Sequence, residues 1–386
     1  MKFLGYPRTD GQTGTRNYVG IISTVVCANE VAKGISDKVN GCVAFSHQQG
    51  CCQTPPDLTR VTQTLCGLGT NPNLASVLLV GLGCEGTDMP EVKEAVKASG
   101  KRVETIIIQE EGGAARTIAK GVLLAQDMVL EASRMRPVEC GTKDLVLGLK
   151  CGSSDTTSGL AANPALGVAV ERIVKEDATV VMGEITEFIG AEHIMAEHAR
   201  DKATGRKILD LVQRMEDRAK AIGVDMRGGQ PTPGNIAGGL TTIEEKSLGA
   251  IAKAGNAVVQ EVYEYGERPG VKGLVVMDSP GREPEILTGL AAAGCNVITF
   301  TTGRGAPQGF PFVPVIKITA NEKTWTRMQD HMDLSVHLVM AGDETLNQAG
   351  GRIYDVIETV AGGTRTKAEI SGYVQAMDIY VTGPVI

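Results

Sequence analysis

The sequence of 386 residues is long enough for two or three globular domains, and its 42% hydrophobic and 22% charged residues are ordinary for a globular protein. The formal charge of −7, from 38 basic and 45 acidic side chains, comes without any basic run, which argues against nucleic-acid binding. The sequence shows no transmembrane stretch and no apolar signal segment, so we expect a cytoplasmic protein that binds no membrane.

Short β-rich runs alternate with helical stretches along the chain, the pattern of α/β proteins with mainly parallel sheets. The predicted strands cover residues 18–26, 43–45, 76–82, 103–108, 145–149, 179–182, 271–277, 296–300 and 313–318. The predicted helices cover residues 28–39, 58–68, 91–99, 114–135 and 166–176, with a largely helical region at 185–223 and a Gly/Pro-rich loop at 228–239. We therefore predict two Rossmann-like α/β domains, an N-terminal domain over residues 1–137 and a C-terminal catalytic domain over residues 138–386.

Chemically capable side chains follow several predicted strands, and open parallel sheets bind ligands where their strands end. They are His47 and Cys51, then Cys84, then Cys151, Ser154 and Asp155, and finally Thr302 and Arg304. Each alone is more often structural, but their coincidence at strand ends favours a site. Imidazole and thiolate suit Fe(II) or Zn(II) better than Mg(II), which makes His47, Cys51, Cys84 and Cys151 candidate metal ligands. The alternative is that three of these cysteines hold an iron–sulfur cluster.

Two further segments carry acid–base and anion-binding groups. Glu187 and His193 can act as base and acid, unless their stretch is simply a solvated charged helix. The loop at Asn235 leads into a helix whose first N–H groups can bind an anion, and Lys246 on that helix is either a base or a member of an ion pair. Arg304, which stands between two glycines, can clamp a carboxylate or sulfonate through two parallel hydrogen bonds.

Taken together, these segments resemble the altronate/galactarate dehydratase family over nearly the whole chain. The matching stretches are Gly14-Thr15-Arg16-Asn17-Tyr18, His47-x-x-Gly50-Cys51, Gly81-Leu82-Gly83-Cys84-Glu85, Cys151-Gly152-Ser153-Ser154-Asp155, Ser158-Gly159-x-x-Ala162-Asn163-Pro164, Glu187-x-x-Gly190-Ala191-Glu192-His193, Pro233-Gly234-Asn235, Glu244-Glu245-Lys246-Ser247-Leu248-Gly249 and Phe300-Thr301-Thr302-Gly303-Arg304-Gly305. One departure is Ser153, where the family commonly has glycine.

The resemblance implies an iron-dependent β-eliminating lyase, with Fe²⁺ or an iron–sulfur cluster, that acts on a small 2-hydroxy acid. A proton leaves C2, a group leaves C3, and the resulting enol becomes a 2-keto acid. The leaving group is sulfite if the substrate is 3-sulfolactate, and water if it is a sugar acid. The catalytic candidates are then Lys246, His193 and Glu187, and the substrate-binding candidates are Arg304, Thr302, Asn235, Ser154 and Asp155.

The family's sugar-acid dehydratases usually carry a small domain ahead of the region that this sequence matches. Its absence from the sequence leads us to expect a separate small alpha subunit as a partner of this larger subunit, within an oligomer.

Overall fold

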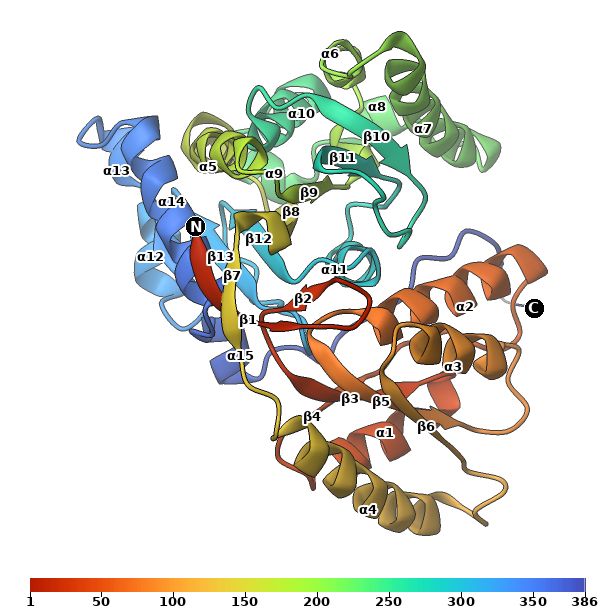
Figure 1. Cartoon of the computed structure of the whole chain (residues 1–386). Helices are drawn as coiled ribbons and strands as arrows, with labels where there is room; N and C mark the ends of the chain where they lie inside the picture. Colours follow the sequence, from red (N-terminus) through yellow and green to blue (C-terminus); the bar gives the residue numbers. More distant parts are fainter. Residues whose placement is uncertain (385) are drawn as a thin grey trace.

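The computed structural model describes residues 1–384 and 386, and it contains two α/β units, each built on a parallel sheet (Figure 1). The predicted fold class is confirmed: both large sheets are entirely parallel and neither closes into a barrel. The second sheet has seven strands and the first has four.

The first unit has the strand order β4-β3-β5-β6. Its elements are β3 (Tyr18–Ser23), η1 (Val26–Ala28), α1 (Asn29–Ser36), β4 (Cys42–Phe45), α2 (Pro55–Thr70), β5 (Leu74–Gly81), α3 (Met89–Ala98), β6 (Arg102–Ile107) and α4 (Ala114–Ala132). Because side chains alternate along a strand, β5 sends Leu78 and Val80 toward α1 and α4, and Val77 and Leu79 toward α2 and α3. Strand β5 is therefore apolar on both faces of the sheet, as expected of a parallel sheet that is covered by helices on both sides.

The second unit has the strand order β10-β11-β9-β8-β12-β13-β14. Its elements are β8 (Val146–Gly152), η3 (Ser158–Ala162), α5 (Asn163–Lys175), β9 (Thr179–Met182), η4 (Ile185–Glu187), α6 (Glu192–Glu197), α7 (Lys202–Ala221), α8 (Met226–Gly229), α9 (Pro233–Ala237), α10 (Ile243–Ile251), η5 (Ala252–Ala254), β10 (Val259–Tyr263), β11 (Gly273–Met277), α11 (Glu283–Ala292), β12 (Val297–Thr302), β13 (Val315–Thr319), α12 (Glu322–Arg327), β14 (Leu334–Ser335), α13 (Leu338–Ala341), α14 (Leu346–Ala361) and α15 (Lys367–Ser371).

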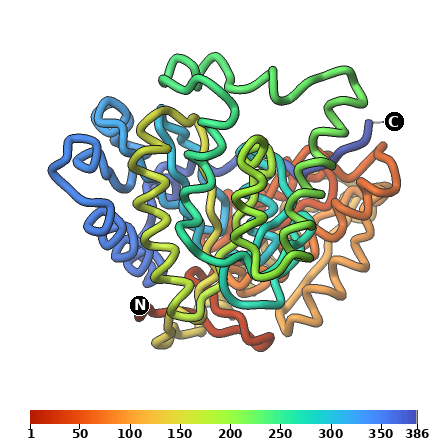
Figure 2. The backbone as a smooth tube through the Cα atoms, turned by 90° about the horizontal axis from the view of Figure 1, so that it is seen from above, coloured from red at the N-terminus to blue at the C-terminus, as the bar shows by residue number. Residues whose placement is uncertain are grey.

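Two features of the second unit differ from the sequence prediction. The segment at 228–239, predicted as a loop, contains the short helices α8 and α9. The hydroxyl of Thr232 accepts a hydrogen bond from Asn235 N–H, so a side-chain cap starts α9 despite the glycines around it. These green helices run along the outer edge of the molecule when it is seen from above (Figure 2). Strand β10 was also missed.

A small antiparallel sheet joins the two units, and the sequence pattern did not predict it. Strand β1 (Lys2–Pro7) pairs with β2 (Thr13–Gly14) on one side and with β7 (Val138–Gly141) on the other. The first strand of the chain therefore lies beside the strand that leads into the second unit.

The two units also share a hydrophobic core. One cluster of buried side chains takes in Val77 and Leu79 of β5, residues of α2 and α11, and Ile298 and Phe300 of β12. Helices α2 and α11 approach closely, since a Cβ at Gly67 would lie 2.5 Å from the carbonyl oxygen of Ala292. Within the described residues, no helix is both long and apolar enough to cross a membrane.

Candidate active site

A cavity of about 530 Å³ opens at the carboxyl edge of the seven-stranded sheet, where strand-end loops meet α10. Its walls include Ser154 and Asp155 after β8, Asn163 of α5, and Lys246 of α10. This is the edge at which the sequence predicted a site, and the position agrees with the general rule for parallel sheets.

Glu187 and Lys246 form an ion pair at this cavity. The Lys246 Nζ lies 3.0 Å from Glu187 Oε1, and both side chains are about nine-tenths buried, with 11% and 10% of their surface exposed. Lys246 Nζ also donates to Gln230 Oε1 at 3.2 Å. The second carboxylate oxygen, Glu187 Oε2, is buried and has no hydrogen-bond partner in the described chain. The pair thus places a carboxylate oxygen without a partner beside an ammonium group, the two kinds of group that acid–base catalysis uses.

Asp155 is held rigidly between the loops. Its Oδ1 accepts from Thr157 Oγ1 at 2.7 Å and from Ser158 N–H at 3.0 Å, while its Oδ2 accepts from Asn321 Nδ2 at 2.7 Å. A Cβ at Gly303 would lie 2.2 Å from Asp155 Cγ, so the loop after β12 can pass this carboxylate only as glycine. Asp155 therefore shapes the cavity floor more than it offers a free oxygen to a substrate.

The other predicted substrate-binding residues do not line the cavity, but hydrogen bonds hold them close to the loop that carries Ser154. Asn235 Nδ2 donates to the carbonyl oxygen of Ser154 at 2.9 Å. Arg304 is exposed, and its Nη1 donates to the carbonyl oxygen of Gly234 at 2.8 Å. The buried hydroxyl of Thr302 accepts from Gly305 N–H at 3.1 Å. The structure thus gathers Ser154, Asp155, Asn235, Thr302 and Arg304 with the Glu187–Lys246 pair, although they come from distant parts of the sequence.

His193 lies apart from this group. It is exposed on α6 and borders a shallow surface hollow together with Glu197, Lys202 and Arg206 rather than the cavity that holds Lys246. The backbone breaks at Gly190, whose φ of 93° ends the turn that carries Glu187. The prediction that His193 and Glu187 act together is not met in the structure.

The four predicted metal ligands do not form a metal site. Among residues 1–384 and 386, no three or more His, Cys, Asp or Glu side chains are arranged to hold an ion. His47 is fully buried at the end of β4, where its Nε2 donates to Ser23 O at 3.0 Å and its Nδ1 accepts from Gln49 N–H at 3.1 Å. Both ring nitrogens are therefore occupied, and burial lowers the pKa of His47 to about 4.

The predicted cysteine ligands lie in two places. Cys51 and the exposed Cys84 are in loops of the first unit, where Gly50 O accepts from Gly86 N–H at 2.9 Å. Cys151 lies on β8 of the second unit and is 1% exposed; burial raises the pKa of its thiol to about 12. A buried thiol of this kind is a poor source of the thiolate that a metal needs.

Cys151 instead belongs to a charged cluster that the sequence reading missed. Lys150, Glu184 and Lys253 are all at most 1% exposed, and both lysines pair with the one carboxylate. Lys150 sits on a strand whose neighbours are apolar, and Lys253 on a short turn after α10, so neither carries a motif. The sequence signal for this cluster was a lysine inside an otherwise apolar strand, because lysine is almost never fully buried without a partner.

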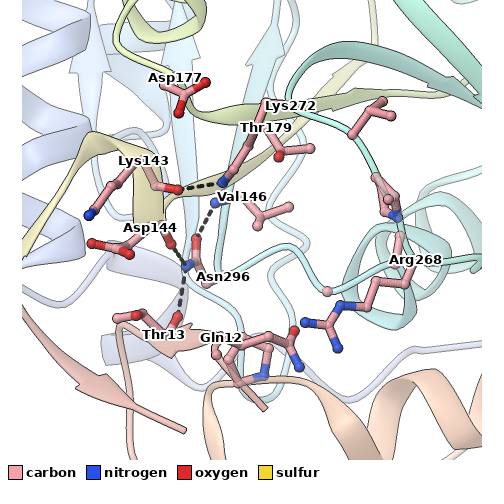
Figure 3. Close-up of a pocket in the computed structure, with 17 residues that line it drawn as sticks. Gln12, Thr13, Lys143, Asp144, Val146, Asp177, Thr179, Arg268, Lys272 and Asn296 are labelled. Carbon is pink, nitrogen blue, oxygen red and sulfur yellow. Dashed lines mark hydrogen bonds between the residues drawn. The ribbon is translucent and has the colours of Figure 1, made fainter. Parts of the chain in front are cut away.

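A second cavity, of about 380 Å³, opens at the opposite edge of the same sheet (Figure 3). Asn296 ties its wall together by donating to Thr13 O and Asp144 O, and Lys272 donates to Lys143 O. The carboxyl ends of α2, α5 and α11 lie near this edge, where cationic side chains balance the negative ends of helices. This cavity offers no acid–base pair comparable to Glu187 and Lys246.

The fold and the site define an α/β protein in which the Glu187–Lys246 ion pair lies beside a cavity at the carboxyl edge of a parallel sheet. The family model described as D-galactarate/Altronate dehydratase, C-terminal, matches residues 142–383. The model described as D-galactarate dehydratase/Altronate hydrolase, second domain, matches residues 5–133. The chain therefore belongs to the galactarate/altronate dehydratase family, and it is an enzyme of the lyase class.

Three relatives show how far the similarity extends. The chain is 38% identical to the (2R)-sulfolactate sulfo-lyase subunit beta of Chromohalobacter salexigens, over 96% of this chain and 95% of the relative. It is 33% identical to the altronate dehydratase of Escherichia coli, over 94% of this chain and 74% of that protein. It is 31% identical to the galactarate dehydratase (L-threo-forming) of the same organism, over 94% and 73% of the two chains.

Proposed function

We propose that the chain is the large subunit of a lyase that converts (2R)-3-sulfolactate to pyruvate and sulfite. The observation that carries this proposal is the 38% identity to a sulfolactate sulfo-lyase subunit over 96% of this chain, compared with 33% identity to the altronate dehydratase over 94% of it. Because the relative is named as a beta subunit, the proposal includes a separate small alpha subunit as partner, in a cytoplasmic oligomer.

The Glu187–Lys246 pair suits removal of the C2 proton. Lys246 lines the cavity and meets the substrate, while Glu187 stands behind it and shares its proton. As the pair takes up the C2 proton, the electrons of the C2–H bond form the C2–C3 double bond and the C3–S bond breaks. Sulfite leaves with the bonding electrons, and the enol left behind tautomerises to pyruvate by gaining a proton at C3 and losing the proton of its C2 hydroxyl.

The substrate carries two negative charges, a carboxylate and a sulfonate. Arg304 uses one guanidinium nitrogen on Gly234 O, and its other N–H groups are without hydrogen bonds in the described chain. Those groups can clamp an anionic oxygen pair close to the loop that carries Ser154. Iron is proposed as the cofactor on the family resemblance alone, since no three or more His, Cys, Asp or Glu side chains among residues 1–384 and 386 are arranged to hold it.

The rival is an altronate-type dehydratase that forms a 2-keto-3-deoxy acid, favoured by the 33% identity to altronate dehydratases over 94% and 88% of this chain. The test assays the anaerobically purified subunit complex on (2R)-3-sulfolactate, altronate and galactarate. We expect sulfite and pyruvate in equal amounts from sulfolactate, with both lost in a Lys246→Met variant. Keto-deoxy acid from altronate without sulfite from sulfolactate would establish the rival, and iron content is measured on the same preparation.

A further inference from the structure

Beneath the Glu187–Lys246 pair lies a fully buried charged cluster made of Lys150, Glu184 and Lys253. The Lys150 Nζ is 2.6 Å from Glu184 Oε1, and the Lys253 Nζ is 2.8 Å from Glu184 Oε2. The same Oε2 accepts from Cys151 N–H at 2.9 Å. Burying three charges is costly, and chains keep such groups only where they are well paired. The chemistry proposed above does not use them directly, so their presence needs another explanation.

The backbone at Glu184 is strained. Glu184 has a φ of 66° and a ψ of 59°, the left-handed conformation that residues other than glycine rarely adopt. Such strain persists only where the surroundings hold the residue in place, and it concentrates at functional sites. At Glu184 the holding contacts are the two lysines on its carboxylate and the hydroxyl of Ser279, which accepts from Glu184 N–H at 2.7 Å.

Glu184 directly positions the turn that carries Glu187. It is the residue that precedes η4, and its carbonyl oxygen accepts from Glu187 N–H at 2.8 Å. Only two residues, Ile185 and Thr186, separate the anchored Glu184 from Glu187, whose carboxylate pairs with Lys246 of the cavity wall. If the anchor is released, the strained backbone can relax toward an ordinary conformation, and Glu187 then moves relative to Lys246.

Lys150 also holds the other side of Glu187. Its Nζ donates to Gly281 O at 3.1 Å. Gly281 packs against η4 so closely that a Cβ there would lie 2.6 Å from Thr186 Oγ1 and 3.5 Å from Glu187 Oε1. One buried lysine thus joins the Glu184 anchor to the turn that confines the Glu187 carboxylate.

The charges of the cluster support the same role. Burial acts to raise the pKa of Glu184, but Lys150 and Lys253 outweigh it and hold that pKa below its ordinary range. Glu184 is therefore a carboxylate shared by two lysines. Lys253 makes its remaining contact with the Cys151 thiol at 3.2 Å. The two lysines and the one carboxylate thus leave a net positive charge buried close to the Glu187–Lys246 pair.

We propose that Lys150, Glu184 and Lys253 form a positioning unit for the Glu187–Lys246 pair, which locks the left-handed backbone at Glu184 and keeps the Glu187 carboxylate fixed at the cavity. The catalytic consequence rests on the proposed lyase function, whereas the structural consequence does not. The two can therefore be measured separately.

The activity test compares Glu184→Gly, Lys253→Met and the double variant Glu184→Gln/Lys253→Met in the subunit complex. Glycine adopts the left-handed backbone freely but removes the anchor, so Glu184→Gly separates strain from anchoring. We expect kcat to fall about 100-fold in all three, since a displacement of about 1 Å can cost that much. In Lys253→Met, the pH profile of kcat/KM should also change, because a buried cation close to the Glu187–Lys246 pair is lost.

The double variant removes one buried cation and one anion together, so it leaves the net charge of the cluster unchanged and Lys150 bonded to the carbonyl oxygens of Cys151 and Gly281. The control is Glu369→Gln, which breaks the buried Arg16–Glu369 ion pair far along the chain from the cavity residues. It should lower stability without moving the pH profile. Folded Glu184→Gly and double variants with wild-type kcat would overturn the proposal.

A second readout needs no activity. Amide hydrogen exchange is followed in the peptide covering residues 183–191, which contains the Glu187 N–H bonded to Glu184 O. We expect exchange to be at least about tenfold faster in the double variant and unchanged in Glu369→Gln. Unchanged exchange in the double variant would refute positioning, even if no substrate is turned over. If the double variant exchanges faster but the wild-type complex releases neither sulfite nor keto-deoxy acid, the proposed function alone is refuted.

Discussion

Substitutions of Glu187 and Lys246 should show that the two side chains stabilise the fold together. Loss of either side chain should remove most of the catalytic activity. Two unit charges 3.0 Å apart attract by about 5 kcal/mol at an effective dielectric constant of about 20. Taking both groups out of water cancels much of this, and we expect a net coupling of about 2 kcal/mol. Lys246→Met should cost about 3 kcal/mol of unfolding free energy, because it leaves a buried carboxylate whose Oε2 is already without a partner.

The assay is a double-mutant cycle of Lys246→Met, Glu187→Gln and their combination, with unfolding followed in urea. The double variant should lose about 2 kcal/mol less than the sum of the two single variants. A matched control is the exposed pair Lys33–Asp37, one helical turn apart, whose coupling should not exceed about 0.5 kcal/mol.

Catalysis is measured on the same proteins. Each single variant should lower kcat by a factor of about 100 to 10,000, and the double variant should be no worse than the poorer single variant, because residues that act as a unit are not additive. The assignment of these residues as an acid–base pair would be refuted if the stability losses of the two single variants add up to that of the double variant within about 0.5 kcal/mol. A single variant that retains wild-type kcat would also refute it.

Two further predictions concern His47 and Gly303. Burial lowers the pKa of His47 from 6.5 to about 4, so the unfolded chain takes up a proton below pH 6.5 while the folded chain does so only near 4. Folded stability should therefore fall by about 3 kcal/mol as the pH drops through this window, and His47→Gln should lack that component in urea titrations; parallel pH dependences would contradict it. Gly303→Ala should cost about 1–3 kcal/mol and most of the activity, since its Cβ meets Asp155 Cγ at 2.2 Å. Gly351→Ala, where a Cβ meets nothing within 4 Å, should leave activity unchanged, and equal effects of both substitutions would refute the steric argument.

The hydrophobic pattern of the sequence predicted the class of the fold correctly, because hydrophobic periodicity depends on local secondary structure. The strand predicted at residues 179–182 is β9, and the other predicted strands overlap the observed ones. Strands β1, β2 and β7 were missed because they form a small antiparallel sheet, in which no continuous apolar run is required and β2 has only two residues. Strand-end positions also pointed to Ser154, Asp155 and Arg304, since parallel strands end at a common edge.

By itself, the sequence determined the family, the parallel α/β fold and the segments from which the site is built, because motifs and hydrophobic patterns are local properties. Only the tertiary structure decided which of these segments meet. It paired Lys246 with Glu187 and left His193 on the surface, because the break at Gly190 turns α6 away. It also placed Cys151 beside Lys253 instead of beside His47, and it buried Lys150 and Glu184 beneath the cavity. Ion pairs between residues far apart in the chain form only when the chain packs, so no spacing of residues in the sequence predicts them.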